Sequence, residues 1–404
     1  MAESRPTILQ IIPELDTGGA ELSTIEIAQA IVQAGGRALV MSEGGRLASS
    51  LADVGGELIF FPAATKNPAR VAWNGIKIAR FIKSSNVDLV HARSRAPAWS
   101  ALAGARSAGV PFVTTYHGAY GEKGPIKKLY NSVMARSDIV IANSRYTAGL
   151  IEDRYGTADN KIRVIYRGVS GDQFDPSRIS SDAISELRAS WGVGDDRRII
   201  LNAARLTGWK GQSVIIEAVR RMKEADCLGD GVVILAGDAQ GRSTYQDELL
   251  RQIETGGLSQ DVKLVGHVDD MPLAFAAAFL SVVASTEPEA FGRAATEAQI
   301  MGCPVIATRI GAPKETVLTP PRTEKEDATG WLIEPGSSAD LADTMAIALS
   351  MTEQSRHLMG ARARAHVLSS FTLEAMKKQT LGVYDDLLGS QLCSRYGRHT
   401  QGVD

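Results

Sequence analysis

Short runs of branched apolar residues alternate with amphipathic segments along most of the chain. Continuous apolar runs are typical of strands buried on both faces, and their alternation with helical patterns predicts a parallel sheet covered by helices. The first series predicts strands at 7–12, 38–41, 57–61, 87–91, 112–116, 139–142 and 163–166, with helices at 21–34, 70–84 and 129–136 among others. This series predicts one doubly wound α/β domain.

A second series of the same kind follows a polar stretch. Breaks at Asp175-Pro176 and Gly192-Val193-Gly194 separate the two series. The second predicts strands at 198–203, 232–236, 262–265, 280–284, 304–307 and 331–333. We therefore expect two Rossmann-like domains, 1–190 and 191–372, that face each other across a cleft. A last helix begins at about 373, and the polar tail from Gly389 is expected to fray.

The composition of the chain excludes several classes of protein. Of 404 residues, 44% are hydrophobic and 22% charged, as in ordinary globular proteins, and the net charge of −2 gives no reason to expect nucleic acid as a partner. Three scattered cysteines predict neither a disulfide scaffold nor a zinc site, but reduced thiols in the cytoplasm. The apolar run near the start, 8–12, is too short for a signal peptide, and the longest apolar run, about 273–284, is too short for a membrane span. We therefore expect a protein that is neither secreted nor membrane-spanning, although it could lie on a membrane.

Glycines follow the first predicted strand and open a helix. In the segment from Pro13 to Glu21, Gly18 and Gly19 would let the backbone approach a phosphate at the helix N-terminus. The pattern is not G-x-G-x-x-G, which argues against a nicotinamide enzyme. A tight turn without a ligand explains these glycines equally well.

Two cations follow the first strand of the second domain. Arg205 and Lys210 lie on a loop that contains glycine, and such a pair suits a diphosphate because Arg can grip two oxygens while Lys adds a point charge. The alternative is two solvated surface cations.

The segment from Glu287 to Ala298 joins a predicted strand to a helix. Glu289 would lie in the loop, where it can bind sugar hydroxyls, and Glu297 would lie on the helix, where it can accept both hydroxyls of a ribose. Between them, Phe291, Gly292 and Arg293 would present backbone N–H groups to phosphate. The alternative is a pair of solvated surface acids.

On these residues the chain resembles the retaining nucleotide-sugar glycosyltransferases of family 4, which have the GT-B fold. Glu289 and Glu297 match the family's Glu-x7-Glu signature, including the Phe-Gly after the first acid. The segments Met301-Gly-Cys-Pro-Val305, Gly311-Ala-Pro-Lys-Glu315 and Thr329-Gly-Trp-Leu332 match its continuation, Gly237-Asp238 follows the next strand as usual there, and Gly18-Gly19-Ala20-Glu21 and Tyr116-His117-Gly118 match the loops of the first domain. The resemblance extends from Ile8 to about Leu387 and is most specific in the second domain.

The resemblance implies a role for each matching residue. Glu289 would contact the donor sugar, Glu297 the ribose, and Arg205 and Lys210 would stabilise the departing diphosphate. Gly19 would lie near the same phosphates. His117 would face the reacting sugar, unless it is simply hydrogen-bonded within its turn. His267 and Val268 would border the base, which could be uridine or guanosine, and the helix from about 373 to 404 would return to the first domain.

The resemblance also implies the chemistry. A hexose would be transferred with retention of configuration, either by reaction on one face of the sugar or through a glutamate nucleophile. No Asp-x-Asp occurs in the chain, so we expect no metal and no other cofactor, with the two cations supplying the positive charge.

The acceptor would bind the first domain. Arg93, Arg95, Tyr120 and Lys123 belong to basic, aromatic segments that could receive an anionic glycolipid and touch anionic headgroups. A solvated helix face explains them equally well. We expect a saccharide or lipid-linked acceptor in lipopolysaccharide core or other surface polysaccharide synthesis, and a peripheral location on the inner face of the cytoplasmic membrane.

Rival functions share the same scaffold. A nucleotide-sugar epimerase or a glycosyl phosphorylase would use a similar pair of domains, and only a product assay separates these from a transferase. A two-lobed small-molecule sensor is a further alternative, which the intact donor motif disfavours.

Overall fold

The computed structural model describes residues 5–16, 18–121, 124–239, 241 and 243–401. The chain forms two compact units: unit 1 comprises Met1–Tyr166 and Glu374–Asp404, and unit 2 comprises Arg167–Leu373. The predicted boundary at 190 therefore lies inside unit 2. The reason is that helix α7 (Ser181–Ser190) packs against α10 (Met271–Ala277) of the same unit.

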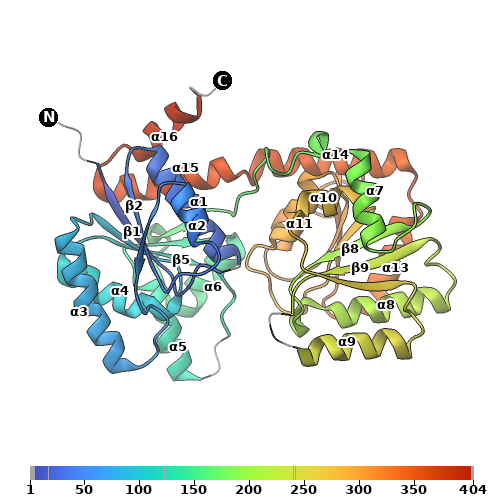
Figure 1. Cartoon of the computed structure of the whole chain (residues 1–404), viewed down its shortest axis with the longest axis horizontal. Helices are drawn as coiled ribbons and strands as arrows, with labels where there is room; N and C mark the ends of the chain where they lie inside the picture. Colours follow the sequence, from blue (N-terminus) through green and yellow to red (C-terminus); the bar gives the residue numbers. More distant parts are fainter. Residues whose placement is uncertain (1–4, 17, 122–123, 240, 242, 402–404) are drawn as a thin grey trace. The chain divides into compact units, whose positions relative to one another are not determined.

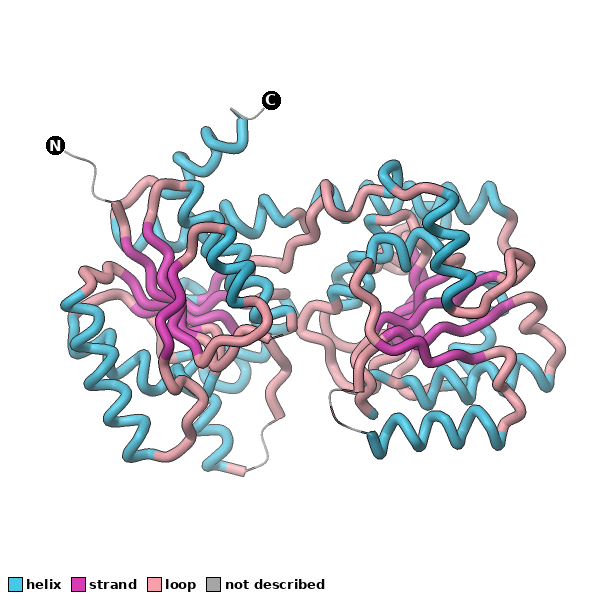
Figure 2. The backbone as a smooth tube through the Cα atoms, viewed as in Figure 1, coloured by secondary structure: helices cyan, strands magenta, loops and turns pink. Residues whose placement is uncertain are grey.

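Unit 1 contains a parallel sheet whose described strands run in the order β3-β2-β1-β4-β5-β6-β7. Helices cover both faces of this sheet (Figures 1 and 2). The strands are β1 (Thr7–Ile11), β2 (Arg37–Ser42), β3 (Glu57–Phe60), β4 (Leu89–Ala92), β5 (Phe112–Tyr116), β6 (Ile139–Ala142) and β7 (Ile162–Val164). The helices are α1 (Gly19–Gln33), α2 (Ala48–Asp53), α3 (Pro68–Ser84), α4 (Arg95–Ala108), α5 (Pro125–Asn131), α6 (Arg145–Tyr155), α15 (Leu373–Leu388) and α16 (Leu392–Gln401), with 3-10 turns at Ser132–Ala135 and Asp159–Lys161.

Helix α15 is joined to the sheet of unit 1 by polar contacts. The hydroxyl of Tyr384 lies 2.7 Å from Nδ1 of His91 on β4, and Lys377 Nζ donates to Gln29 of α1 at 2.6 Å. Burial lowers the pKa of His91 well below its ordinary value, so we treat the imidazole as neutral. The last part of the chain therefore packs on the first domain.

The prediction that the tail from Gly389 frays is wrong. Residues Leu392–Gln401 form α16, in which Leu392 and Tyr396 are buried. The carboxylate of Asp385 accepts hydrogen bonds from the backbone N–H groups of Leu392 and Cys393 at 2.7 and 2.8 Å, which caps the start of the helix. Two apolar anchors and a cap were enough to order a segment whose composition is mostly polar.

Unit 2 contains a second parallel sheet, with its described strands in the order β10-β9-β8-β11-β12-β13. The strands are β8 (Arg198–Ala203), β9 (Gly231–Ala236), β10 (Val262–Gly266), β11 (Leu280–Val283), β12 (Val305–Thr308) and β13 (Gly330–Ile333). The remaining helices are α8 (Gln212–Glu224), α9 (Ser243–Thr255), α11 (Arg293–Ile300), α12 (Pro313–Thr316), α13 (Ser338–Leu349) and α14 (Glu353–Ser370), with 3-10 turns at Pro176–Arg178, Gly208–Lys210 and Lys325–Asp327. The predicted pair of doubly wound α/β domains is confirmed.

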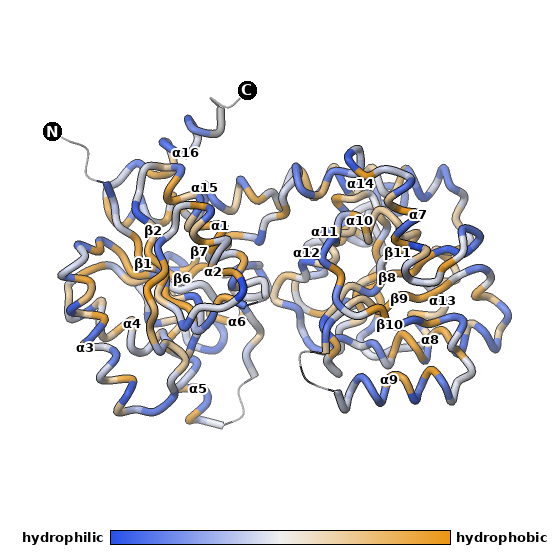
Figure 3. Tube along the Cα trace, viewed as in Figure 1, coloured by the Kyte–Doolittle hydropathy of each residue, from blue (hydrophilic) through white to orange (hydrophobic). Residues whose placement is uncertain are grey.

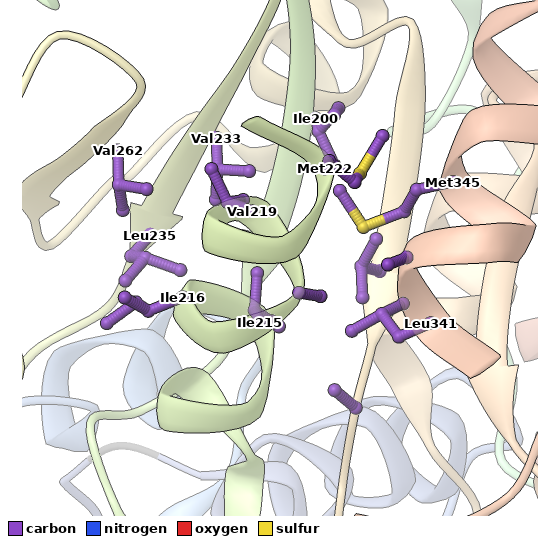
Figure 4. Packing of buried hydrophobic residues seen from close by; sticks show 14 of the residues in the cluster. Ile200, Ile215, Ile216, Val219, Met222, Val233, Leu235, Val262, Leu341 and Met345 are labelled. Carbon is purple, nitrogen blue, oxygen red and sulfur yellow. The ribbon is translucent and has the colours of Figure 1, made fainter. Parts of the chain in front are cut away.

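The core of unit 2 lies between its sheet and the helices α8 and α13. Apolar side chains of α8, such as Ile215 and Val219, pack against Ile200 and Val233 of the strands, and Leu341 and Met345 of α13 complete the layer (Figure 4). The strands are the most hydrophobic segments of the trace, whereas the outer helix faces are polar (Figure 3). Each fully buried side chain of this size contributes about 1.5–3 kcal/mol to stability.

No helix within the described residues combines the length and the apolar character that crossing a membrane requires.

Candidate donor site

The strand order of unit 2 reverses between β8 and β11. These neighbouring strands pair in parallel, with Leu280 beside Ile200 and Ser281 beside Leu201. Their C-terminal loops run in opposite directions from this point, which is where ligands bind in open α/β sheets. The loop after β8 carries Lys210 and the loop after β11 carries Glu289, so residues that lie far apart in the sequence meet there.

Lys210 and Glu289 form an ion pair at the strand ends. Lys210 Nζ donates to Glu289 Oε1, which also accepts a hydrogen bond from the hydroxyl of Ser285 at 2.6 Å. Their side chains are only 17% and 9% exposed, so neither is a solvated surface charge. The pair places one cation and one carboxylate, largely shielded from water, at the topological switch point.

The Lys210 loop lies very close to the backbone that follows β11. A Cβ atom on Gly211, whose φ is +75°, would lie 1.9 Å from the carbonyl oxygen of Ala284. The carbonyl oxygen of Trp209 accepts a hydrogen bond from the N–H of Thr286 at 2.7 Å, and Lys210 Nζ lies 4.3 Å from the centroid of the Trp209 ring. Glycine at 211 is therefore required for Lys210 to reach Glu289.

Glu289 is held by its own backbone as well as by its side chain. It forms an isolated parallel bridge with Gly311, and its carbonyl oxygen accepts from Ala312 N–H at 2.9 Å. A Cβ atom on Gly311 would lie 2.3 Å from that same oxygen, so only glycine fits beside the loop. The predicted match of the segment from Gly311 thus has a physical role in positioning Glu289.

Helix α11 begins directly after the Glu289 loop. Gly292 is its N-cap, with a left-handed backbone (φ +81°), and Phe291 is buried. Glu297 lies on the helix one turn after Arg293, whose Nε donates to its carboxylate at 3.1 Å. The first turn of any helix leaves backbone N–H groups without partners inside the helix, which makes this end of α11 suitable for an anion.

The remaining predicted donor residues lie on the same edge of the sheet but outside this cluster. Arg205 lies two residues after the end of β8 and is exposed, and in the described part of the chain its guanidinium makes no ion pair. His267 and Val268 follow β10, two strands away from β8, and His267 Nε2 lies 3.1 Å from a carboxylate oxygen of Asp269.

Sequence reasoning missed two polar residues of the cluster. Ser285 hydrogen-bonds Glu289, and Asn202 of β8 lines a cavity of about 20 Å³ together with Lys210, Ser285, Glu289 and Arg293. A cavity of about this size holds one water molecule. Asn202 is the lone uncharged polar residue inside an apolar strand, which is the signal that could have pointed to it.

Several predicted residues lie at the corresponding edge of unit 1. Gly18 and Gly19 are exposed at the start of α1, and His117 follows β5, with its backbone N–H donating to the Tyr120 hydroxyl at 3.3 Å. The guanidinium carbon of Arg95 lies 3.7 Å from the centroid of the Tyr120 ring. Arg95 and Tyr120 thus hold each other beside the His117 turn. Lys123 lies outside the described residues.

The prediction that places Arg93 on an acceptor surface disagrees with the structure. Arg93 is 3% exposed, and burial lowers its pKa to about 10. Successive side chains alternate between the faces of a strand, so Arg93 shares with His91 the face on which Tyr384 of α15 packs. Its buried guanidinium interacts electrostatically with Glu26 of α1, so Arg93 belongs to the interior of unit 1 and not to its surface.

Among the described residues, no group of three or more His, Cys, Asp or Glu side chains is close enough together to hold a metal ion.

Comparison with known families matches both units. Residues 17–173 match the profile described as Glycosyltransferase Family 4, and residues 183–366 match the one described as Glycosyl transferases group 1. Among curated proteins, the D-inositol 3-phosphate glycosyltransferase of Xylanimonas cellulosilytica is 32% identical over 237 residues, which is 58% of this chain. The chain spans about half the length (53%) of this relative and of the corresponding protein of Geodermatophilus obscurus.

Solved structures cover nearly the whole chain. A glycosyltransferase from Rickettsia africae ESF-5 is 32% identical, and its superposition covers 96% of this chain and 100% of that one with a TM-score of 0.87. Anabaena Alr3699/HepE, solved in complex with UDP-glucose, is 26% identical with 94% and 100% covered and a TM-score of 0.81. The chain has the GT-B fold and belongs to glycosyltransferase family 4.

Proposed function

We propose that the protein transfers a hexose from a nucleoside diphosphate sugar to a saccharide or lipid-linked acceptor, with retention of configuration. The observation that carries this proposal is the shielded Lys210–Glu289 pair at the switch point of unit 2, with the start of α11 beside it. UDP is the first nucleotide to test, because the Anabaena relative binds UDP-glucose, and GDP is the alternative.

The ion pair stabilises both charges and can still give way to a charged donor. A largely buried charge is costly unless it is paired, and Lys210 and Glu289 satisfy each other without ligand. The diphosphate would replace Glu289 as the partner of Lys210, and the sugar hydroxyls would replace Lys210 as the partner of Glu289. Ser285 would keep its hydrogen bond to Glu289 and hold that carboxylate in place.

The rest of the donor would lie along the following helix. Glu297 would accept the ribose hydroxyls, and the first turn of α11 after Gly292 would face the diphosphate. As the sugar–phosphate bond breaks, negative charge grows on the departing diphosphate. Lys210 and the exposed Arg205 would stabilise that charge in the transition state, where electrostatic stabilisation has the largest effect on rate.

A transfer assay tests this function and separates its rivals. We expect one UDP- or GDP-hexose to yield a glycosylated product, followed by mass spectrometry and by NMR of the anomeric proton. Because the two cations supply the positive charge, excess EDTA should leave the rate within about twofold of the untreated rate. Epimerised donor without acceptor product would indicate an epimerase, and release of sugar 1-phosphate a phosphorylase. Loss of turnover in EDTA would contradict the expectation that the two cations replace a metal.

The acceptor proposal rests on a surface of unit 1 formed by α3 and α5. Both helices flank α4: α3 packs on it, and Trp99 of α4 donates to the carbonyl oxygen of Tyr130 on α5 at 3.1 Å. Figure 1 shows α3, α4 and α5 on one side of the unit 1 sheet. The exposed large apolar side chains here are Trp73 (54%), Ile76 (47%), Ile126 (84%) and Leu129 (57%). The exposed charged residues of the two helices are Arg70, Lys77, Arg80, Lys83, Lys127 and Lys128, and neither helix contains Asp or Glu.

Exposed apolar side chains among cations alone suit an anionic membrane surface. We propose further that this α3/α5 surface docks on the inner face of the cytoplasmic membrane. Docking would bring the enzyme to a lipid-linked saccharide of lipopolysaccharide core or another surface polysaccharide.

Vesicle co-sedimentation tests the docking. We expect binding to vesicles with anionic lipid at low salt, and about a 30-fold weaker partition for the double variant Lys127→Gln/Lys128→Gln, at about 1 kcal/mol per cation. Ile126→Ser should weaken binding further, whereas Ile347→Ser on unit 2, which removes an apolar side chain that is 58% exposed, should not. Equal binding to neutral vesicles, or none at low salt, would rule out this surface as the anchor.

A further inference from the structure

The chain crosses between its two units twice. The two crossing segments are hydrogen-bonded to each other where they enter and leave unit 2. The first crossing follows Tyr166 and the second follows Leu373. Val169 N–H donates to the carbonyl oxygen of Phe371 at 2.9 Å, and Leu373 N–H donates to that of Val169 at 3.0 Å. A Cβ atom on Gly168 would lie 2.2 Å from Leu373 Cα, so the two segments touch backbone to backbone.

Phe371 also contacts the loop of the donor site. Its ring meets that of Phe291 edge to face, with centroids 5.8 Å apart and planes at 73°, and both side chains are at most 4% exposed. Phe291 lies two residues after Glu289 and directly before Gly292. The ring of Phe371 also meets that of His366 of α14, with centroids 5.3 Å apart.

Arg364 of α14 also links the segment after the first crossing to the donor helix α11. Its guanidinium donates to the carbonyl oxygen of Phe174 at 3.1 Å and to that of Ile300, the last residue of α11, and it lies 3.7 Å from a carboxylate oxygen of Asp175. The segment after the first crossing, α14 and the end of the donor helix are therefore one packed assembly.

We propose that Phe371 is a positioning residue that couples the donor loop to the paired crossings. This inference rests on the proposed function in taking the Glu289 loop as the donor site. A donor that replaces Lys210 as the partner of Glu289 acts on this loop two residues before Phe291, and small displacements there reach the Phe291 ring while Ser285 stays bonded to Glu289. The ring contact transmits these displacements to Phe371, whose carbonyl oxygen accepts from Val169 N–H, so that donor occupancy acts on the two segments that connect the units.

Hydrogen exchange of the ligand-free protein tests the coupling without any assumption about the substrate. We expect Phe291→Leu and Phe371→Leu to accelerate exchange of the Val169 and Leu373 amides about two- to tenfold, the factor that corresponds to the interaction energy of an aromatic pair. Phe291→Leu is the decisive variant, because Phe291 lies in the donor loop and its ring meets that of Phe371. Gly171→Ala is the matched control, because its Cβ would make only an ordinary 3.4 Å contact with Leu368. Unchanged exchange in the Phe291 variant would overturn the coupling.

Measurements of kcat and of UDP affinity test the consequence of this coupling for activity. Gly168→Ala forces the crossings apart, so we expect kcat to fall about tenfold while UDP affinity changes less than twofold, with Gly171→Ala unchanged in both. If Gly168→Ala does not fold, Phe371→Leu serves in its place. Equal kcat in Gly168→Ala and Gly171→Ala would overturn the proposal. A wild type that binds no nucleotide would instead refute the proposed function and leave the exchange result to decide the coupling.

Discussion

Lys210→Met and Glu289→Gln are each expected to lower kcat/KM by about 10²–10³-fold without unfolding the protein. Lys210 would lose its charge at the point where the diphosphate departs, and Glu289 would lose its ability to accept from two sugar hydroxyls. Gln at 289 keeps the shape of the side chain and avoids leaving a cavity. Because the two residues act on one donor, the double variant should lose less than the product of the two single effects.

Lys223→Met is the control for this pair. Lys223 Nζ lies 2.6 Å from Asp261, which directly precedes β10 and so belongs to the opposite edge of the same sheet. This variant removes a Lys–carboxylate contact of the same chemistry and should keep kcat/KM within about twofold, because the contact lies at the edge of the sheet away from the Lys210 and Glu289 loops. Kinetics and thermal unfolding measured side by side decide the matter: near-normal turnover in either Lys210→Met or Glu289→Gln would exclude that residue from the site.

Gly211→Ala is expected to reduce both stability and activity. Alanine at φ +75° is strained by about 1–3 kcal/mol, and its Cβ would have to displace the Ala284 carbonyl oxygen that lies 1.9 Å from the ideal position. The loop must then move away from β11 and carry Lys210 with it, so we expect a fall in kcat/KM of about 10²-fold, comparable to the loss of Lys210 itself.

Gly208→Ala in the same loop separates this effect from a general sensitivity of the loop. A Cβ atom on Gly208 would meet nothing within 4 Å, and its φ is not positive. We expect wild-type melting temperature and turnover from it. If Gly211→Ala behaved like Gly208→Ala, the close approach of the loop to β11 would not position Lys210.

The strands could be predicted from the sequence because they are buried on both faces. The expected runs at 112–116, 139–142 and 198–203 coincide with β5, β6 and β8. The domain boundary could not be predicted as well. The polar stretch from Gly171 looks like a linker, but Arg364 binds Phe174 and Asp175 across nearly two hundred residues and makes the stretch part of unit 2.

The residues of the candidate site could be predicted from the sequence, but the contacts between them could not. The spacing of Glu289 and Glu297 indicated a loop and a helix face, whereas the ion pair of Glu289 with Lys210 depends on β8 and β11 being neighbours, which no local pattern encodes. Arg93 shows the opposite case. Its position after a strand was predicted, but its burial depends on the packing of α15, almost three hundred residues later.

A crystal structure of the protein with UDP, or with GDP if GDP binds more tightly, would show whether Lys210, Glu289 and Glu297 hold the donor. We expect the diphosphate at the C-terminal ends of β8 and β11, with Lys210 Nζ moved from Glu289 onto a phosphate oxygen, the ribose hydroxyls on Glu297, and Ser285 still bonded to Glu289. A nucleotide bound elsewhere, with the Lys210–Glu289 pair intact, would contradict this expectation.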